Sequence, residues 1–181
     1  DSRKLVSGEV FFAFPGERVD GHQFLPQAIE KGAAAVVSER QPEAGFPIPW
    51  VRVAHGRVAM ALAALRFYQH PDRRLFLTGV TGTNGKTTTV YLIDSILRAA
   101  GFTTGYFGTI EQAIAGRRRA AVNTTPESLD LVRNFVELEQ QRGTHATFEV
   151  SSHALELRRV YGLQFHTVVF LNLTRDHLDF H

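Results

Sequence analysis

An apolar stretch that runs directly into a glycine-rich loop constrains the fold of this chain more than any other feature. Residues 75–80, "LFLTGV", are apolar except for Thr78, as expected for a central strand of a parallel sheet. The loop "TGTNGKTT" follows at residues 81–88, and residues 86–100 predict a helix that Gly101 stops. A strand, a glycine-rich loop and a helix in this order are typical of phosphate-binding sites in α/β proteins.

The loop differs from the common phosphate-binding pattern at one position. That pattern, G-x-x-x-x-G-K-[ST], needs a glycine where this chain has Val80, and glycines stand at 79, 82 and 85 instead. Lys86 is placed to reach phosphate oxygens, and Thr87 to hold Mg²⁺ through its hydroxyl. The loop therefore predicts a nucleoside triphosphate site of a subclass other than the standard kinases and motor ATPases. The alternative is a glycine-rich turn without a ligand.

The segments after this loop continue the alternation of strands and helices. "TTGYFGT", "HATFEVSS" and "HTVVFLNL" predict strands, the last two buried, and Pro126 to Arg142 predicts a helix with Thr125 as N-cap. This order indicates a doubly wound, mostly parallel α/β sheet, in which ligands bind beyond the C-terminal ends of the strands.

A smaller α/β unit precedes the loop. It is predicted as a strand at Val10–Phe14, a helix that ends near Gly32, strands in "AAVVSE" and "PWVRV", and a helix from His55 to His70. The segment "YQHPDRRL" contains Pro71 and predicts a linker. We therefore expect an N-terminal domain over residues 1–73 and a nucleotide-binding domain over residues 74–181.

Composition excludes several classes of protein. Of the 181 residues, 44% are hydrophobic and 21% charged, which is ordinary for a globular protein, and there is no cysteine for disulfides or thiolate chemistry. The net charge of +2 is too small to indicate a nucleic-acid partner. No apolar run approaches a membrane span, and the first residues do not resemble a signal peptide. We therefore expect a cytoplasmic protein that neither binds nucleic acid nor inserts into a membrane.

An acid ends the predicted strand "ATFEV". A carboxylate such as Glu149 is costly there unless it is paired or bound to a cation. We expect it to hold Mg²⁺ opposite Thr87, because both lie at the same edge of the sheet; an ion pair with an arginine is the alternative. The following "SSH" invites a serine-hydrolase interpretation, but no G-x-S-x-G elbow is present. Substrate binding or capping of the next helix are simpler roles.

The tail "NLTRDHLDFH" carries two histidines four residues apart. His177 is predicted to bind a metal ion at the triphosphate site, and His181 to be structural; a separate zinc pair and a polar helix cap are alternatives. The basic run "AGRRRAA" at residues 115–121 predicts a solvated hairpin tip.

Four motifs in combination resemble the Mur ligases of peptidoglycan synthesis. They are "TGTNGKTT" (81–88), "NTTP" (123–126), "EVSSHAL" (149–155) and "NLTRDHLDFH" (172–181). The opening "DSRKLVSGEVFFAFPGERVDGHQF" is similar to the N-terminal domain that the third- and fourth-step members share. "NTTP" together with "EVSSHAL" indicates the third-step ligase, since the fourth-step member normally lacks "EVSSHAL".

The resemblance implies site residues by position. The implied ATP-binding residues are Gly82, Thr83, Asn84, Gly85, Lys86, Thr87 and Thr88. The implied residues for the UDP-sugar peptide are Asn123, Thr124, Thr125, Ser151 and Arg159, with Ser2, Glu17, Arg18 and Val19 at the uridine end. Thr87, Glu149 and His177 would bind two Mg²⁺ ions, and Lys86, Glu149 and His177 would be catalytic. Leu157 stands where some members have a substrate-contacting glutamine.

The resemblance also implies a reaction. ATP phosphorylates a peptide carboxylate, the amine of an amino acid attacks the acyl phosphate, and the products are an amide, ADP and phosphate. The implied acceptor is UDP-MurNAc-L-Ala-D-Glu, and the added residue is meso-diaminopimelate or lysine. The family's carbamylated lysine and its C-terminal amino-acid-selecting domain have no counterpart in these residues. We therefore expect a piece of a longer, monomeric ligase, inactive alone.

Three other functions stay open at this point. One is a sister ligase, either the fourth-step enzyme or a folylpolyglutamate-type synthetase. The second is a non-catalytic nucleotide-binding module, although Lys86, Thr87, Glu149 and His177 are all intact. The third is a zinc hydrolase using His177 and His181, for which no third ligand is identified.

Overall fold

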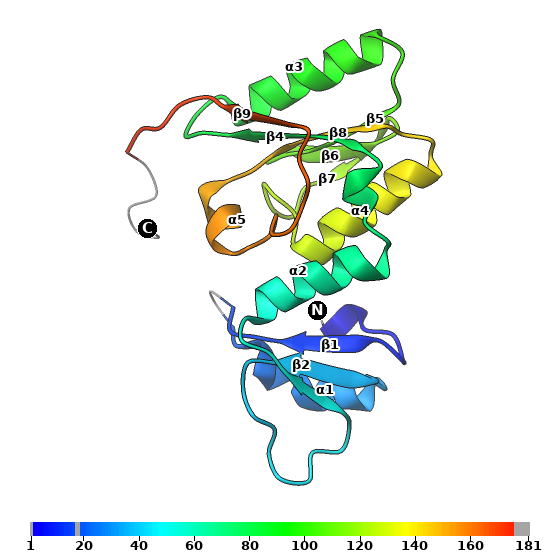
Figure 1. The fold of residues 1–181 in the computed structure, drawn as a ribbon, viewed down its shortest axis with the longest axis vertical. Helices are drawn as coiled ribbons and strands as arrows, with labels where there is room; N and C mark the ends of the chain where they lie inside the picture. Colours follow the sequence, from blue (N-terminus) through cyan, green and yellow to red (C-terminus); the bar gives the residue numbers. More distant parts are fainter. Residues whose placement is uncertain (1, 17–18, 176–181) are drawn as a thin grey trace. The chain divides into compact units, whose positions relative to one another are not determined.

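The computed structural model describes residues 2–16 and 19–175, and the chain divides into two compact units, Asp1–Met60 and Ala61–His181 (Figure 1). The division falls inside helix α2 (Gly56–Phe67). The domain boundary expected at residues 73 and 74 stays a prediction. The first unit is built around a parallel sheet and the second around a mostly parallel one, as the alternation of predicted strands and helices indicates.

The first unit contains a three-stranded parallel sheet in the order β1-β2-β3. Its strands are β1 (Val10–Ala13), β2 (Ala35–Ser38) and β3 (Trp50–Arg52). Helix α1 (Leu25–Glu30) follows a 3-10 turn, η2 (Gly21–Phe24), and another 3-10 turn, η1 (Ser2–Lys4), opens the unit. The core of this unit consists of small and branched side chains together with one aromatic ring: Phe11, Ala13, Ala28, Ala33 and Val36.

The second unit contains a six-stranded sheet in the order β7-β6-β5-β8-β4-β9. Four strands run parallel: β4 (Phe76–Thr81), β5 (Thr104–Phe107), β8 (His145–Glu149) and β9 (Thr167–Phe170). An antiparallel hairpin, β6 (Glu111–Ile114) and β7 (Arg117–Ala120), extends one edge. The prediction of a mostly parallel α/β sheet is therefore confirmed. The basic run lies on β7, whose four residues are all exposed, and the turn of the hairpin is Ala115–Gly116.

Helices cover both faces of this sheet. Helix α3 (Lys86–Ala99) lies on one face, while α4 (Ser128–Gln140) and the short α5 (Ser152–Glu156) lie on the other (Figure 1). Under α4, three aromatic rings from different elements pack together, with Phe107, Phe135 and Phe148 each fully buried. Under α3, Val80 and Val90 form a smaller cluster with Tyr106. The 3-10 turn η3 (Pro71–Arg73) precedes β4, so the predicted linker has a turn of its own.

Helix α4 begins two residues later than the sequence predicts. Its N-cap is Glu127, so the prediction that Thr125 caps a helix starting at Pro126 is wrong. Thr125 is fully buried, and its hydroxyl donates to the carbonyl of Glu149 at 2.8 Å instead of accepting from a helix amide. The tertiary bond to the end of β8 therefore replaces the local cap.

Strand β9 is less buried than the sequence predicts. Val168 and Phe170, which alternate onto one face of the strand, are 63% and 65% exposed. Val169, on the other face, packs against the cluster under α3. The prediction of a buried strand is wrong because β9 is the edge of the sheet and only one of its faces is covered.

Within residues 2–16 and 19–175, none of the helices has the length and apolar character that crossing a bilayer requires.

Candidate functional site

The motifs meet where three neighbouring parallel strands end. Strand β4 leads into the loop 82–85, β5 leads into Gly108, and β8 ends at Glu149. Since β4 and β5 both pair with β8, these three ends lie at one edge of the sheet. This is the edge at which ligands bind in doubly wound folds.

The loop presents the start of α3 to this edge. Gly85 is the N-cap with φ of 88°, a left-handed conformation that glycine adopts without strain. The amides of Lys86, Thr87 and Thr88 are the first of the helix, so they have no carbonyl partner one turn back. The Lys86 ammonium donates to the carbonyls of Gly82 at 2.6 Å and of residue 83 at 2.9 Å. Free helix amides beside a lysine form an anion site.

Asn172, after β9, fastens the other half of the loop. Its carbonyl accepts from the amide of Thr83 at 3.1 Å, and its Oδ1 accepts from the amide of Asn84 at 2.9 Å. Its Nδ2 also donates to the carbonyl of Asn84 at 3.1 Å. Two loop amides are thus already engaged, which leaves the amides at the start of α3 for a phosphate. The sequence interpretation quoted this residue within a motif but gave it no role.

Glu149 is 1% exposed and lies opposite Thr87. Its Oε1 accepts from the Thr87 hydroxyl at 2.9 Å and from the amide of Thr109 at 2.8 Å, and its Oε2 accepts from the Thr109 hydroxyl at 3.2 Å. No arginine, lysine or histidine among the described residues forms an ion pair with it, which disfavours the arginine alternative. A buried carboxylate held only by neutral donors suits a divalent cation, because a cation offsets the cost of burying the charge.

The "NTTP" and "EVSSHAL" segments are bonded to each other. Thr125 accepts from the amide of Ser151 at 3.1 Å, and its carbonyl accepts from Arg159 at 3.1 Å. Arg159 also pairs with Glu127 at 2.9 Å. Four of the five residues expected to hold the sugar peptide therefore belong to one hydrogen-bonded group with Glu149: Thr124, Thr125, Ser151 and Arg159. Thr124 is connected to Glu149 through Thr109. The fifth residue, Asn123, lies in the same loop as Thr124.

The hydroxyl of Ser151 accepts from the amide of Ala154 at 3.2 Å and so caps α5. This is the simpler role that the sequence left open, and no histidine contacts that hydroxyl among its described bonds. Leu157 is the C-cap of the same helix.

Several expected site residues belong to the first unit or lie outside the described residues. Glu17, Arg18 and His177 are outside the described ranges, as is His181. Ser2 is buried, and its hydroxyl donates to Gln27 at 2.6 Å, while Val19 is exposed. Among the residues that the structure describes, no group of three or more His, Cys, Asp or Glu could hold a metal ion, so the described part of the site offers a cation Glu149 and hydroxyls.

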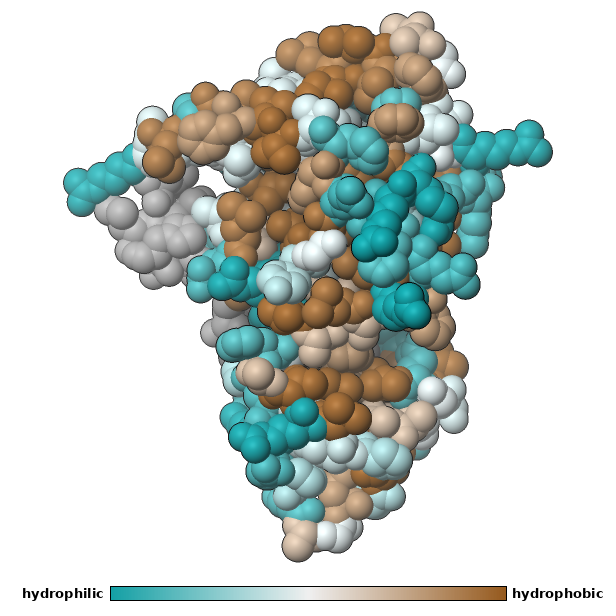
Figure 2. All heavy atoms as spheres, viewed as in Figure 1, coloured by the Kyte–Doolittle hydropathy of each residue, from teal (hydrophilic) through white to brown (hydrophobic). Residues whose placement is uncertain are grey.

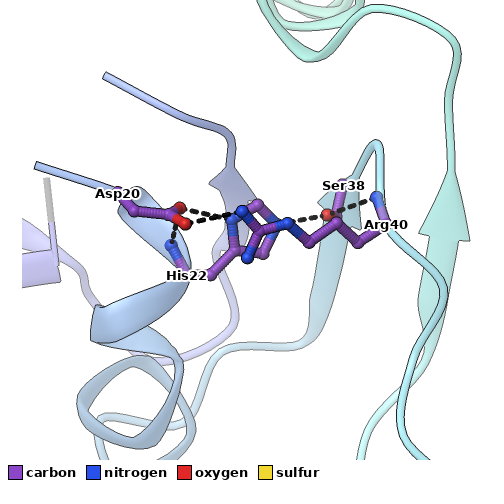
Figure 3. A network of polar contacts seen from close by, with 4 residues as sticks. All are labelled: Asp20, His22, Ser38 and Arg40. Carbon is purple, nitrogen blue, oxygen red and sulfur yellow. Dashed lines mark hydrogen bonds and ion pairs between the residues drawn. The ribbon is translucent and has the colours of Figure 1, made fainter. Parts of the chain in front are cut away.

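A second polar network, in the first unit, was not foreseen (Figure 3). His22 lies between Asp20 and Ser38, with Nδ1 2.6 Å from Asp20 Oδ1 and Nε2 2.6 Å from Ser38 Oγ. Arg40 donates to Asp20 Oδ2 at 2.7 Å, and its amide donates to Ser38 at 3.1 Å. The order of groups is that of a serine-hydrolase triad, but Ser38 is 0% exposed and its oxygen already accepts a bond. The network is therefore a cross-link between η2 and the end of β2.

Two family models match the chain. Residues 80–181 match the Mur ligase middle domain, and residues 1–68 match the model described as Mur ligase family, catalytic domain.

Named relatives match over the whole chain. It is 60% identical to the UDP-N-acetylmuramoyl-L-alanyl-D-glutamate–2,6-diaminopimelate ligase of Solibacter usitatus, with all of this chain and 37% of that protein covered. It is 49% identical to the protein of the same name from Geobacillus thermodenitrificans, with the same coverage. A solved structure with that name superposes with a TM-score of 0.83 at 34% identity, covering 98% of this chain and 36% of the other. The chain thus spans about 37% of the length of these curated relatives.

Proposed function

Because this chain belongs to the Mur ligase family, we propose that it forms the N-terminal and middle parts of a UDP-N-acetylmuramoyl-L-alanyl-D-glutamate–2,6-diaminopimelate ligase. The reaction joins 2,6-diaminopimelate to the glutamate carboxylate of the UDP-linked dipeptide, with ATP as the phosphoryl donor. Support for this substrate pair comes from the names of relatives that match the whole chain. The choice of 2,6-diaminopimelate over lysine rests on those names, since the sequence alone left both open.

The observation that carries this proposal is the buried carboxylate of Glu149, held by neutral donors beside the phosphate loop. The residues present fit Mg²⁺: Glu149 and the Thr87 hydroxyl would hold it, and it would neutralise charge on the phosphate oxygens of ATP. A second Mg²⁺, held by His177, remains the expectation from the resemblance.

The chain's own groups would act on the transferred phosphoryl. The Lys86 ammonium and the amides of Thr87 and Thr88 lie at the start of α3, where they would stabilise negative charge that develops on the phosphoryl group. Lys86 must leave the loop carbonyls for this, which is a change of side-chain rotamer. The carboxylate oxygen attacks the γ-phosphorus, ADP leaves, and the amine then displaces phosphate from the acyl carbon. The bonded group around Thr125 and Arg159 would hold the peptide in line for these steps.

The test uses full-length protein that carries this chain. Phosphate release from ATP should require the UDP-linked dipeptide and 2,6-diaminopimelate together, and lysine should not replace the latter. Lys86→Ala should lower kcat/KM at least about 100-fold, as loss of a preorganised charge does. Phosphate release that ignores the UDP substrate would sink the ligase assignment. Nucleotide binding with no turnover under any substrate combination would favour the non-catalytic module. The cytoplasmic location and the monomeric state stay predictions for the same protein.

A further inference from the structure

Three hydrogen bonds hold the carboxylate of Glu149, and Thr109 donates two of them. Its amide donates to Oε1 at 2.8 Å, and its hydroxyl lies 3.2 Å from Oε2, so this one residue contacts both carboxylate oxygens. Thr87 contacts only Oε1. The plane of the carboxylate is therefore set by Thr109, because two bonds to different oxygens fix a rotation that one bond leaves free.

The residue before Thr109 makes this approach possible. A Cβ added to Gly108 would lie 2.5 Å from Glu149 Oε1, closer than any van der Waals contact allows. The glycine at the end of β5 thus leaves the space in which the carboxylate meets the amide of Thr109. The overlapping atom is the end of a side chain, so an added methyl group would turn the carboxylate and leave the sheet in place.

The hydroxyl of Thr109 also lies 3.2 Å from the hydroxyl of Thr124 in the "NTTP" loop. In this contact the Thr109 hydroxyl is the donor, and because a hydroxyl has one proton, it can donate either to Thr124 or to Glu149 Oε2 at one time. The Thr124 oxygen and the Glu149 carboxylate therefore share the single proton of Thr109.

We propose that Thr109 is a positioning residue that orients Glu149 for the divalent cation and couples this carboxylate to the "NTTP" loop through Thr124. The inference rests on the proposed function, in which Glu149 binds the cation of the nucleotide. Thr109 itself is exposed, so its hydroxyl can be removed without opening a cavity in the core.

Direct metal binding tests this without reference to turnover. The probe is Mn²⁺ titrated into full-length protein with ADP and followed by electron paramagnetic resonance. Thr109→Val keeps the shape and the amide but removes the hydroxyl, and we expect about 10-fold weaker Mn²⁺ binding, the scale of one lost bond to a charged group. Thr109→Ser should bind Mn²⁺ within about 2-fold of the unchanged protein, because the hydroxyl returns. Thr103→Val, an exposed threonine at the opposite ends of the strands, is the matched control and should change nothing.

Gly108→Ala and a double-mutant cycle complete the test. Gly108→Ala should weaken Mn²⁺ binding more than Thr109→Val does while the melting temperature stays nearly unchanged. Thr124→Val should tighten binding up to about 3-fold alone, because the Thr109 proton then goes only to Glu149, and it should change nothing in Thr109→Val. Unchanged or tighter Mn²⁺ binding by Thr109→Val would overturn the positioning role of Thr109, and so would additive effects of Thr109→Val and Thr124→Val. Neither result would contradict the proposed function. If the unchanged protein binds ADP but takes up no Mn²⁺ in this titration, the cation site and the positioning role are both wrong.

Discussion

The carboxylate of Glu149 shows what single residues contribute to this site. Its position at the end of a strand could be predicted, because an acid there needs a cation or a partner. The loop residues Lys86 and Thr87 could be predicted as well, since their spacing carries a mechanism. The roles of Thr109 and Asn172 could not, because they depend on which strands are neighbours in the sheet.

Asn172 gives a prediction at the scale of the residue. Asn172→Ala removes the two side-chain bonds to Asn84 and keeps the carbonyl bond to the amide of Thr83. The loop then has to be ordered when nucleotide binds, and two hydrogen bonds of ordinary strength correspond to roughly 1–3 kcal/mol. We expect about 10-fold weaker ADP binding by isothermal titration calorimetry. The control is Asn123→Ala, which lies outside the loop and should bind ADP normally. If Asn172→Ala binds ADP as tightly as the unchanged protein, the side chain of Asn172 does not order the loop for the nucleotide.

Elements were predicted better by type than by extent. Most of the strands and helices lie within one to three residues of the expected ranges, because apolar patterns and glycine stops are local signals. Strands β6 and β7 were missed: "EQAI" lacks a strand pattern, and the arginines of the run predicted as a hairpin tip lie on β7. The start of α4 was misplaced because Thr125 bonds across the sheet to β8, which no local pattern reveals.

The cross-link between η2 and β2 gives a prediction at the scale of elements. Bonds from the amide and ring of His22, with a further bond from Arg40, lower the pKa of Asp20 from 3.8 to about 2. The unfolded chain therefore binds a proton at higher pH than the folded chain. Stability from Asp20 is complete above pH 3.8 and is lost as the pH falls towards 2.

Acid titration of the unchanged chain and of Asp20→Asn measures this effect. Trp50 is the only tryptophan, and its indole donates to the carbonyl of Arg40 at 2.9 Å, so its fluorescence reports on this region. Asp20→Asn should be less stable than the unchanged chain at pH 7, and the difference should disappear near pH 2. A difference that stays constant with pH would show that the charge of Asp20 does not contribute.

At the scale of the whole molecule, the fold class and the family follow from the sequence, and the exposed surfaces do not. Figure 2 shows apolar side chains over α3, where Leu92 and Ile96 are exposed, and the uncovered face of β9 adds Val168 and Phe170. Periodicity identifies an apolar strand, but whether both of its faces are covered depends on the order of strands in the sheet.

The edge strand gives a prediction for the 181-residue chain by itself. An exposed, apolar edge pairs readily with another strand, so we expect this chain to self-associate at high concentration. Val168→Lys should suppress this, because a charge on an edge strand opposes pairing. Sedimentation velocity measures the effect, with the exposed Arg117→Lys on β7 as control. A chain that stays monomeric without the change would contradict this prediction, which does not concern the full-length protein.

The most direct test of carboxylate activation follows the oxygen atoms. The UDP-linked dipeptide is prepared with ¹⁸O in the glutamate carboxylate that forms the new amide and is turned over by full-length protein with ATP and 2,6-diaminopimelate. An acyl phosphate retains one carboxylate oxygen on phosphorus when the amine displaces it, so the released phosphate should carry one ¹⁸O per amide formed. Phosphate without ¹⁸O, released alongside the amide, would contradict phosphoryl transfer to the carboxylate.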